Sequence, residues 1–489
     1  MNRNMATHPK SVYVLSFAEG WGRFNYYGTQ MILVLYFTKV FLLSNSKSLA
    51  IYGAFASFSF ALPILGGLIA DKLLGSFRAI ILGIIFSILA NLLLSFSIFK
   101  LFCFGLGLNT FGTGLFKSSC ANLIGALYHP EDIKRTRGYT IYYLSINIGA
   151  TLGPIVYGLI SAYYGWNYCF YVTALGLSLG LFFLILNKKY LLQAVLAPKE
   201  KLLTLNLIPG LSLKNFLYFI LLLIGLLLGL PFLFPEIINP LLISFTILIF
   251  FIVLFITLKH PPAEKKRILA ILILGLFGML FFAASLQVGS SIILFINDNV
   301  HHYLFNWNIP TIMFTSLYPL AVIISAPFIT VLWSKLEKRN LNPSTPLKLF
   351  YGLVLAALAF IVFSLAAAFA YPLYNHYYAL GLIVLGNLFL GCGELVLTPA
   401  MFSAINILAP STIKNSMVGL WFLFVAFGGY FSSVIANFST QHISPNNLIE
   451  NLNVFQHAFL SISLATLLLS FILLILVPLI KRLSDIKTF

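Results

Sequence analysis

The feature that most constrains this chain is a series of apolar runs, each about as long as a helix that crosses a lipid bilayer. A transmembrane helix needs about 20 mostly apolar residues to span the hydrocarbon core. Such runs, separated by charged residues and by Gly, Pro and Asn, predict helices near residues 11–38, 48–72, 77–98, 101–126, 137–162, 166–188, 215–234, 237–258, 268–297, 309–334, 346–371, 377–407, 412–440 and 454–481. The chain is therefore predicted to be an all-α integral membrane protein with about fourteen transmembrane helices.

The composition excludes a substantial water-soluble domain. Of the 489 residues, 60% are hydrophobic and only 8% are charged, whereas a soluble protein carries about 25% charged residues. So few charges cannot cover a surface that faces water. Most of the surface is therefore expected to face lipid, which makes the bilayer the main partner of this chain.

Membrane topology explains the net charge of +17. Most of the 29 Lys and Arg fall in loops that alternate along the chain and share one side of the membrane. Lys39, Lys47 and Lys100 fall on the other side, while Arg23 and Lys117 lie within helices. Because cytoplasmic loops carry an excess of Lys and Arg, both termini are predicted to be cytoplasmic. No nucleic-acid partner is expected.

The predicted helices form groups of six, two and six. The predicted domains are a six-helix lobe at 1–190, a linker with two extra helices at 191–267, and a second six-helix lobe at 268–489. The central pair lacks intramembrane charges, so it is expected to face lipid rather than to build a site. Transporters built from two halves bind their solute near the middle of the membrane. This organisation favours a solute transporter.

Four ionisable residues are predicted to lie deep within helices: Glu19, Arg23, Lys117 and Glu394. Each charge in a bilayer costs at least about 2.5 kcal/mol, so such residues indicate function unless they form structural ion pairs or lie near helix ends. Glu19 and Arg23 also interrupt the first apolar run, so a cleaved signal peptide is not expected.

The first helix places a distinctive set of side chains on one face. Glu19 and Arg23 are four residues apart, and Tyr26 and Tyr27 follow at helical spacing. The Arg23 guanidinium offers a fork of donors that suits a carboxylate. Asn147, a neutral hydrogen-bonding group, is consistent with either a packing contact or a site residue. Together with Lys117 the first lobe carries net positive charge.

The second lobe supplies one acid, Glu394. A zwitterion with a carboxylate at one end and an ammonium group at the other would satisfy both lobes. The residues alone therefore point to an amino-acid-like or short-peptide solute.

Short motifs in these helices resemble those of one transporter family. The first helix reads FAEGWGRFNYYG, similar to the family pattern ExxERFxYY, and GGLIADKLLGSFRAI resembles a cytoplasmic hinge loop of the major facilitator superfamily. Further matches follow in family order: GTGLFK, INIGA, GELVLTP and GLWFL. The sequence thus resembles the proton-dependent oligopeptide transporter (POT, PTR2) family. This implies the major facilitator superfamily fold, with two six-helix lobes and two extra central helices.

The resemblance also implies a substrate site for di- and tripeptides. Its expected residues are Arg23 and Lys117 at the peptide carboxylate, Glu394 at the amino group, and Tyr26, Tyr27, Asn147, Phe60 and Trp421 around the pocket. Such a transporter needs no cofactor and works by alternating access of its lobes. The expected location is the bacterial inner (plasma) membrane.

Protons are the coupling ion that the resemblance implies. Glu19 is the leading proton carrier, because a carboxylate near Lys117 can exchange protonation for pairing; Lys117 and Glu394 are the other candidates. Asp71 and Arg78 belong to the hinge loop, where charge pairs are expected to hold one state of the lobes.

Three positions depart from the family pattern. Gly22 replaces the second acid of the first helix, Leu286 stands where many members carry an acid before Gln287, and Phe60 stands where some have a tyrosine. The loss of acids bears on proton coupling more than on the fold. Glu19 alone, or Glu19 with Glu394, would then have to carry the proton, or transport would be uncoupled.

Two alternatives remain open from the sequence. One is transport of a different solute, such as an amino acid, nitrate or a drug-like compound. The other is a sensor that binds peptides without moving them. An enzyme is not expected, because no catalytic constellation is visible. Neither the eight His nor the four Cys show metal-ligand spacing, so no metal is expected. The sequence does not indicate an oligomeric state.

Overall fold

The computed structural model describes residues 9–128, 133–192, 206–208, 211–238, 257–339, 343–371, 375–410, 413–441 and 447–484, with single residues between these ranges. The helices and short strands of the first half are α1 (Lys10–Lys39), α2 (Asn45–Ile69), the π-helical turn η1 (Ala70–Leu74), α3 (Ser76–Leu94), α4 (Phe99–Ala126), α5 (Ile133–Tyr163), α6 (Trp166–Leu186), α7 (Lys188–Leu192), β1 (Asn206–Ile208), β2 (Leu211–Ser212), α9 (Leu213–Leu227), α10 (Leu230–Leu233) and η2 (Pro235–Ile237).

The second half is built in the same way. Its elements are α12 (Pro262–Ser285), η3 (Leu286–Gly289), α13 (Ser291–Asn299), β3 (Tyr303–Leu304), β4 (Trp307–Asn308), η4 (Thr311–Ser316), α14 (Leu317–Lys338), α15 (Thr345–Phe369), α16 (His376–Leu408), α17 (Lys414–Thr440) and α18 (Leu448–Ser484). The strands form two antiparallel two-stranded hairpins, β1–β2 and β3–β4.

Long helices occupy nearly every predicted membrane span. In the described part of the chain, 11 are long and apolar enough to cross a membrane. Helices α1 and α4, with 30 and 28 residues, are also long enough to cross a membrane, but they are less apolar because they carry the polar groups of the candidate site. The run near 237–258 lies largely outside the described residues. The fold is thus the predicted all-α membrane architecture.

The predicted helix near 268–297 is interrupted. The 3-10 turn η3 at Leu286–Gly289 separates α12 from α13. The carbonyl oxygen of Leu286 accepts a hydrogen bond from the hydroxyl of Tyr52 at 2.8 Å. Gln287 donates from Nε2 to the carbonyl oxygen of Ser432 at 2.9 Å, and its Oε1 accepts from Ser291 Oγ at 2.7 Å. Neutral groups therefore bond the Leu286 carbonyl oxygen and the Gln287 side chain at the break.

The chain divides into two compact units. Unit 1 contains Met1–Leu42 and Phe58–Glu236, and unit 2 contains Leu43–Ser57 and Ile237–Phe489. Helix α2 therefore contributes its first half to unit 2 and its second half to unit 1. The predicted domain limits at 190 and 267 remain predictions.

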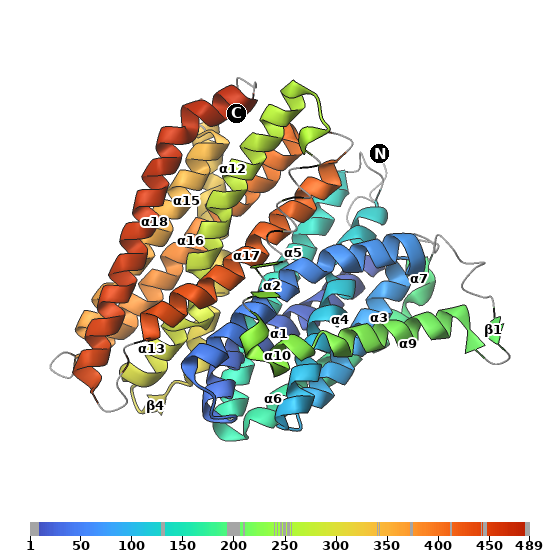
Figure 1. The fold of residues 1–489 in the computed structure, drawn as a ribbon, viewed down its shortest axis with the longest axis horizontal. Helices are drawn as coiled ribbons and strands as arrows, with labels where there is room; N and C mark the ends of the chain where they lie inside the picture. The colour runs from blue at the N-terminus through green and yellow to red at the C-terminus, as the bar shows by residue number, and fades with distance from the viewer. Residues whose placement is uncertain are drawn as a thin grey trace, which may run out of the picture. The chain divides into compact units, whose positions relative to one another are not determined.

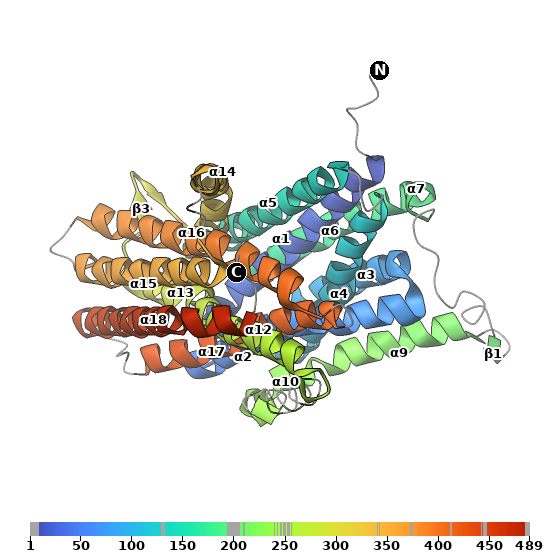
Figure 2. The ribbon, with the colours of Figure 1, turned by 90° about the horizontal axis from the view of Figure 1, so that it is seen from above.

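In unit 1, α9 packs on α3 and α4 (Figure 2). Leu221 of α9 joins a buried cluster that includes Leu108 and Phe111 of α4. Much of the rest of α9 is exposed, including Phe219 at 61%. One side of this extra helix is therefore anchored in the unit, and the other side is available to lipid, as expected for a helix that does not build a site.

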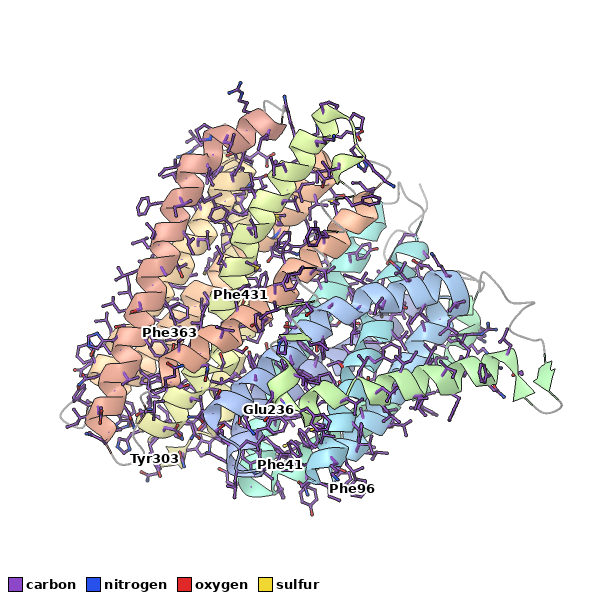
Figure 3. All side chains as sticks on the ribbon, in the orientation of Figure 1. Phe41, Phe96, Glu236, Tyr303, Phe363 and Phe431 are labelled. Carbon is purple, nitrogen blue, oxygen red and sulfur yellow. The ribbon has the colours of Figure 1, made fainter. Side chains whose placement is uncertain are left out.

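In unit 2, α15 runs beside α16 and α18 (Figure 1). Phe363, labelled in Figure 3, lies among aromatic side chains. Its ring centroid is 5.6 Å from that of Phe360 and 6.1 Å from that of Phe459. Ser463 Oγ donates to the carbonyl oxygen of Ala357 at 2.8 Å. Aromatic packing and an interhelical hydrogen bond together hold this layer, as is usual where lipid gives no hydrophobic driving force.

Candidate functional site

Helix α1 carries a buried ion pair. Arg23 Nε lies 2.7 Å from Glu19 Oε1, across one turn of the helix. The residues are only 9% and 1% exposed. The second carboxylate oxygen of Glu19, Oε2, is sealed from solvent.

Lys117 of α4 is an electrostatic neighbour of both members of this pair. Its Nζ lies 4.4 Å from the centroid of the Phe60 ring, which places the ammonium group over an aromatic face. Tyr142 of α5 and Cys120 of α4 also lie near Glu19. Three of the four predicted intramembrane charges thus come together within unit 1.

Aromatic side chains continue from this charge cluster. The ring centroids of Tyr26 and Tyr27 are 4.8 Å apart, and those of Tyr26 and Phe60 are 6.0 Å apart, both with edge-to-face geometry. Tyr27, Phe60 and Lys117 are each half-buried, whereas Tyr26 is buried. The cluster therefore presents a partly accessible aromatic wall with two cations beside it.

Buried asparagines hold the opposite side of α1. Asn25 Nδ2 donates to Asn109 Oδ1 at 2.9 Å, and Asn91 Nδ2 donates to Asn25 Oδ1 at 2.8 Å. This network ties α1 to α3 and α4 close to Arg23. Interhelical hydrogen bonds between side-chain amides fix the positions of helices within a membrane.

Helix α5 approaches α1 closely at Gly149. A Cβ atom at this position would lie 2.2 Å from the carbonyl oxygen of Gly20 and 2.9 Å from Cβ of Arg23. Asn147, two residues earlier, is 8% exposed, and its Nδ2 donates to the carbonyl oxygen of Tyr143 at 2.9 Å. The predicted site residue Asn147 is therefore bonded within its own helix.

Gly22, the position where the family pattern has an acid, is closely packed against α4. A Cβ atom at position 22 would lie 2.5 Å from Cε1 of Phe116, because the Phe116 ring of α4 fills the space beside α1. An acid at this position would require the ring to move. Glu19 is therefore the only carboxylate that α1 supplies to the cluster.

The substitution Gly22→Ala tests this packing. Overpacking a tight core costs about 1–3 kcal/mol, so we expect the variant to unfold at a lower temperature in detergent. Adding Phe116→Leu should restore the unfolding temperature, because it vacates the space that the new methyl group needs. A Gly22→Ala variant as stable as the wild type would contradict the packing described here.

In unit 2, the side chain of Glu394 on α16 accepts a hydrogen bond from the hydroxyl of Tyr318 on α14. Tyr318 is not among the site residues predicted from the sequence. The available signal was its position as a hydroxyl group in the apolar segment SLYPLAVII. Tyr142 was missed for a similar reason, because a tyrosine beside other tyrosines resembles a membrane-interface residue.

Trp421 lies in the core of unit 2. It is 2% exposed, and its ring centroid is 5.9 Å from that of Phe282 and 6.2 Å from that of Phe402.

The two predicted hinge residues lie on neighbouring elements. Asp71 is exposed on η1, and Arg78 lies in the first turn of α3 after Gly75, whose φ is 77°. Among the described residues, no group of three or more His, Cys, Asp or Glu could hold a metal ion.

Comparison with known proteins places the chain in a family. The model of the POT family matches residues 77–452. Dipeptide and tripeptide permease B of Photorhabdus asymbiotica is 27% identical over 483 residues, covering 98% of this chain and 97% of the relative. Peptide transporter YePEPT of Yersinia enterocolitica is 28% identical over 510 residues, covering 99% of this chain and 96% of the relative.

Solved structures agree with this assignment. A crystal structure of peptide transporter POT in complex with sulfate superposes with a TM-score of 0.80 at 28% identity, covering 98% of this chain and 97% of the other. A POT family transporter in complex with a thioalcohol-conjugated peptide superposes with a TM-score of 0.81 at 25% identity, covering 98% of each chain. The helices, the charge cluster of α1 and α4 and these matches lead to one conclusion: the chain is an integral membrane protein that belongs to the POT family.

Proposed function

We propose that this protein transports di- and tripeptides by proton-coupled symport. The observation that carries the proposal is the buried Glu19–Arg23 pair with Lys117 beside it, next to the aromatic wall of Tyr26, Tyr27 and Phe60. This cluster combines an anion-binding surface with a group that can take up a proton. The named permeases and peptide transporters among the relatives support the substrate class.

Arg23 and Lys117 would bind the carboxylate end of the peptide. Their charges are fixed in place by Glu19 and by the Phe60 ring. Tyr26, Tyr27 and Asn147 would lie beside the peptide, and Phe60 would contact its apolar parts. In unit 2, Glu394 would bind the ammonium end, and Trp421 would support the wall of that subsite. No cofactor takes part in these steps.

Proton coupling would work through competition for Arg23. While Glu19 is ionised, its carboxylate occupies Arg23 Nε. A proton on Glu19 removes the negative charge and frees the guanidinium for the peptide carboxylate, since Arg offers a fork of donors that suits either partner. Peptide and proton would then bind together and leave together. Lys117 and Glu394 are the further groups that could exchange a proton during the cycle.

The two lobes, 1–190 and 268–489, would move against each other with 191–267 as a link. Asp71 and Arg78 would stabilise one state of the hinge loop. The protein would lie in the bacterial inner membrane with both termini in the cytoplasm, because the Lys and Arg of the short loops favour that side.

Competition for uptake tests the substrate class. In proteoliposomes containing the purified protein, we expect unlabelled dialanine and trialanine to block uptake of labelled dialanine, and alanine and nitrate to have little effect. Efflux of preloaded peptide in exchange for external peptide would separate a transporter from a sensor. Dialanine binding without any exchange would contradict the proposal and favour the sensor alternative.

A further inference from the structure

Three buried asparagines join α1 to α3 and α4 within unit 1. Asn25 of α1, Asn91 of α3 and Asn109 of α4 are 1%, 0% and 0% exposed. The amides of Asn25 and Asn109 bond each other in both directions, at 2.9 and 3.1 Å, and Asn25 Oδ1 also accepts from Asn91 Nδ2 at 2.8 Å. The hydroxyl of Thr113 on α4 donates to Asn109 Oδ1 at 3.3 Å. Asn25 is therefore the centre of a network that links three helices.

Stability alone does not account for these amides. Burying an amide costs free energy unless hydrogen bonds replace those made to water, and Asn91 Oδ1 is buried and accepts no hydrogen bond from the described residues. Leucine has a similar branched shape and would fill the same space without this cost. A buried asparagine between packed helices can instead fix their register, at some cost in stability. The network therefore indicates that the position of α1 must be held.

The contact of α1 with α5 is of a different kind. A Cβ atom at Gly153 of α5 would lie 2.8 Å from the carbonyl oxygen of Phe24 and 3.0 Å from the backbone nitrogen of Gly28. The two backbones thus touch here, as they do at Gly149, because glycine lets neighbouring helices approach closely. Hydrogen bonds are directional, so the amide network adds what a glycine surface does not supply: one rotation and one height of α1 against α3 and α4.

The position of α1 decides where the cations of the site lie. Arg23 is two residues before Asn25, and Lys117 is eight residues, about two helical turns, after Asn109. The two cations are electrostatic neighbours. Since the amides join the helices that carry them, a rotation or shift of α1 would change the distance between the guanidinium and the ammonium group. A carboxylate that is bound by both cations requires this distance to be held.

We propose that Asn25 is a positioning residue, which holds α1 against α3 and α4 through Asn91 and Asn109. In this role it sets the spacing of Arg23 and Lys117, and with it the preference of the site for a peptide with a free carboxylate. The inference rests on the proposed peptide transport. Asn25 is sealed in the packing of unit 1, so it acts through the two cations rather than by touching the peptide.

The experiment measures how well two competitors block the uptake of trace labelled dialanine into proteoliposomes. Dialanine has a free carboxylate, dialaninamide has a neutral amide in its place, and both keep the amino terminus. The ratio of their half-inhibitory concentrations reports the preference for the carboxylate. This ratio, the maximum uptake rate and the unfolding temperature in detergent are measured for the wild type, Asn25→Leu and the triple variant Asn25→Leu/Asn91→Leu/Asn109→Leu.

The two variants are expected to differ in stability but not in recognition. Asn25→Leu leaves two amides with fewer partners and should lower the unfolding temperature. The triple variant should unfold close to the wild type, because replacing all partners of a buried hydrogen bond by apolar groups of the same shape can be nearly neutral. In both, the half-inhibitory concentration of dialanine should rise about 3–10-fold, less than when a bond to a charged group is lost outright. Inhibition by dialaninamide and the maximum rate should not change.

Ser463→Ala is the matched control. The hydroxyl of Ser463, which is 1% exposed, also makes a bond between two helices, to the carbonyl oxygen of Ala357 at 2.8 Å, but within unit 2. Removing this bond should affect only stability, so the ratio for the two competitors should equal that of the wild type.

A stable triple variant with the wild-type ratio would overturn the proposal, because the amides would then be a structural contact only. A lower maximum rate with an unchanged ratio would overturn it as well. If the leucine variants do not fold, Asn25→Ser, which keeps a polar group on a shorter side chain, decides by the same ratio. Wild-type uptake of dialanine with no preference over dialaninamide would refute the role of Asn25 but not peptide transport, whereas no uptake of dialanine at all would refute the proposed function itself.

Discussion

Replacing Arg23 by glutamine is expected to raise the dialanine concentration for half-maximal uptake by about 10–100-fold. Arg23 is the proposed anchor of the peptide carboxylate, and a hydrogen bond to a charged group contributes about 1.5–3 kcal/mol, where 1.4 kcal/mol is a factor of ten in affinity. The measurement is initial uptake into proteoliposomes as a function of peptide concentration. Glutamine keeps a polar side chain of intermediate length but removes the charge.

Folding must be separated from binding in this variant. Loss of Arg23 leaves the Glu19 carboxylate, which is 1% exposed, without its ion-pair partner. Breaking a buried pair in this way costs about 3–5 kcal/mol. The double variant Glu19→Gln/Arg23→Gln removes both charges and is expected to recover stability in detergent but not peptide affinity. Arg339→Gln, at an exposed arginine, is the control. Wild-type affinity in the double variant would refute the role of Arg23.

Replacing Glu19 by glutamine is expected to abolish accumulation of peptide against a gradient while exchange of peptide for peptide persists. Glutamine cannot bind and release a proton in the working pH range, but it keeps an oxygen that can accept the hydrogen bond from Arg23. With one proton per peptide, a pH difference of one unit supports up to about tenfold accumulation. The variant should show none. Uptake and counterflow are measured in the same proteoliposomes.

A matched acid serves as the control for this second prediction. Glu450 is exposed in the first turn of α18, so Glu450→Gln should accumulate peptide as the wild type does. Full accumulation by the Glu19 variant would contradict its role as proton carrier. In that case Glu394 becomes the next candidate, because it is the other intramembrane acid of the predicted site.

The helices were predictable because the length and hydropathy of each apolar run are enough to indicate a membrane span. The predicted run near 166–188 corresponds to α6 at Trp166–Leu186, and the run near 346–371 corresponds to α15 at Thr345–Phe369. The break at Leu286–Gly289 was not predictable in the same way. The segment is apolar on both sides, and the break depends on partners distant in sequence: Tyr52 at the Leu286 carbonyl oxygen and Ser432 at the Gln287 side chain.

The candidate site shows the same limit. Glu19 and Arg23 were predictable as a pair because four residues separate them on one helix. The proximity of Lys117 depends on how α4 packs on α1, which spacing within one helix does not determine. The same holds for Phe116, which fills the space at Gly22, and for Tyr318, whose partner lies 76 residues further along the chain. Contacts between helices are set by packing, and the sequence of one helix carries little of that information.

The most direct test of the account is gradient-driven uptake. Labelled dialanine is offered to proteoliposomes of the wild-type protein, with and without an inward proton gradient, and the internal concentration is followed to its plateau. We predict accumulation above the external concentration only when the gradient is present, despite Gly22 and Leu286. Equal internal and external concentrations under both conditions would show that Glu19 does not couple transport to protons, and would contradict the central claim.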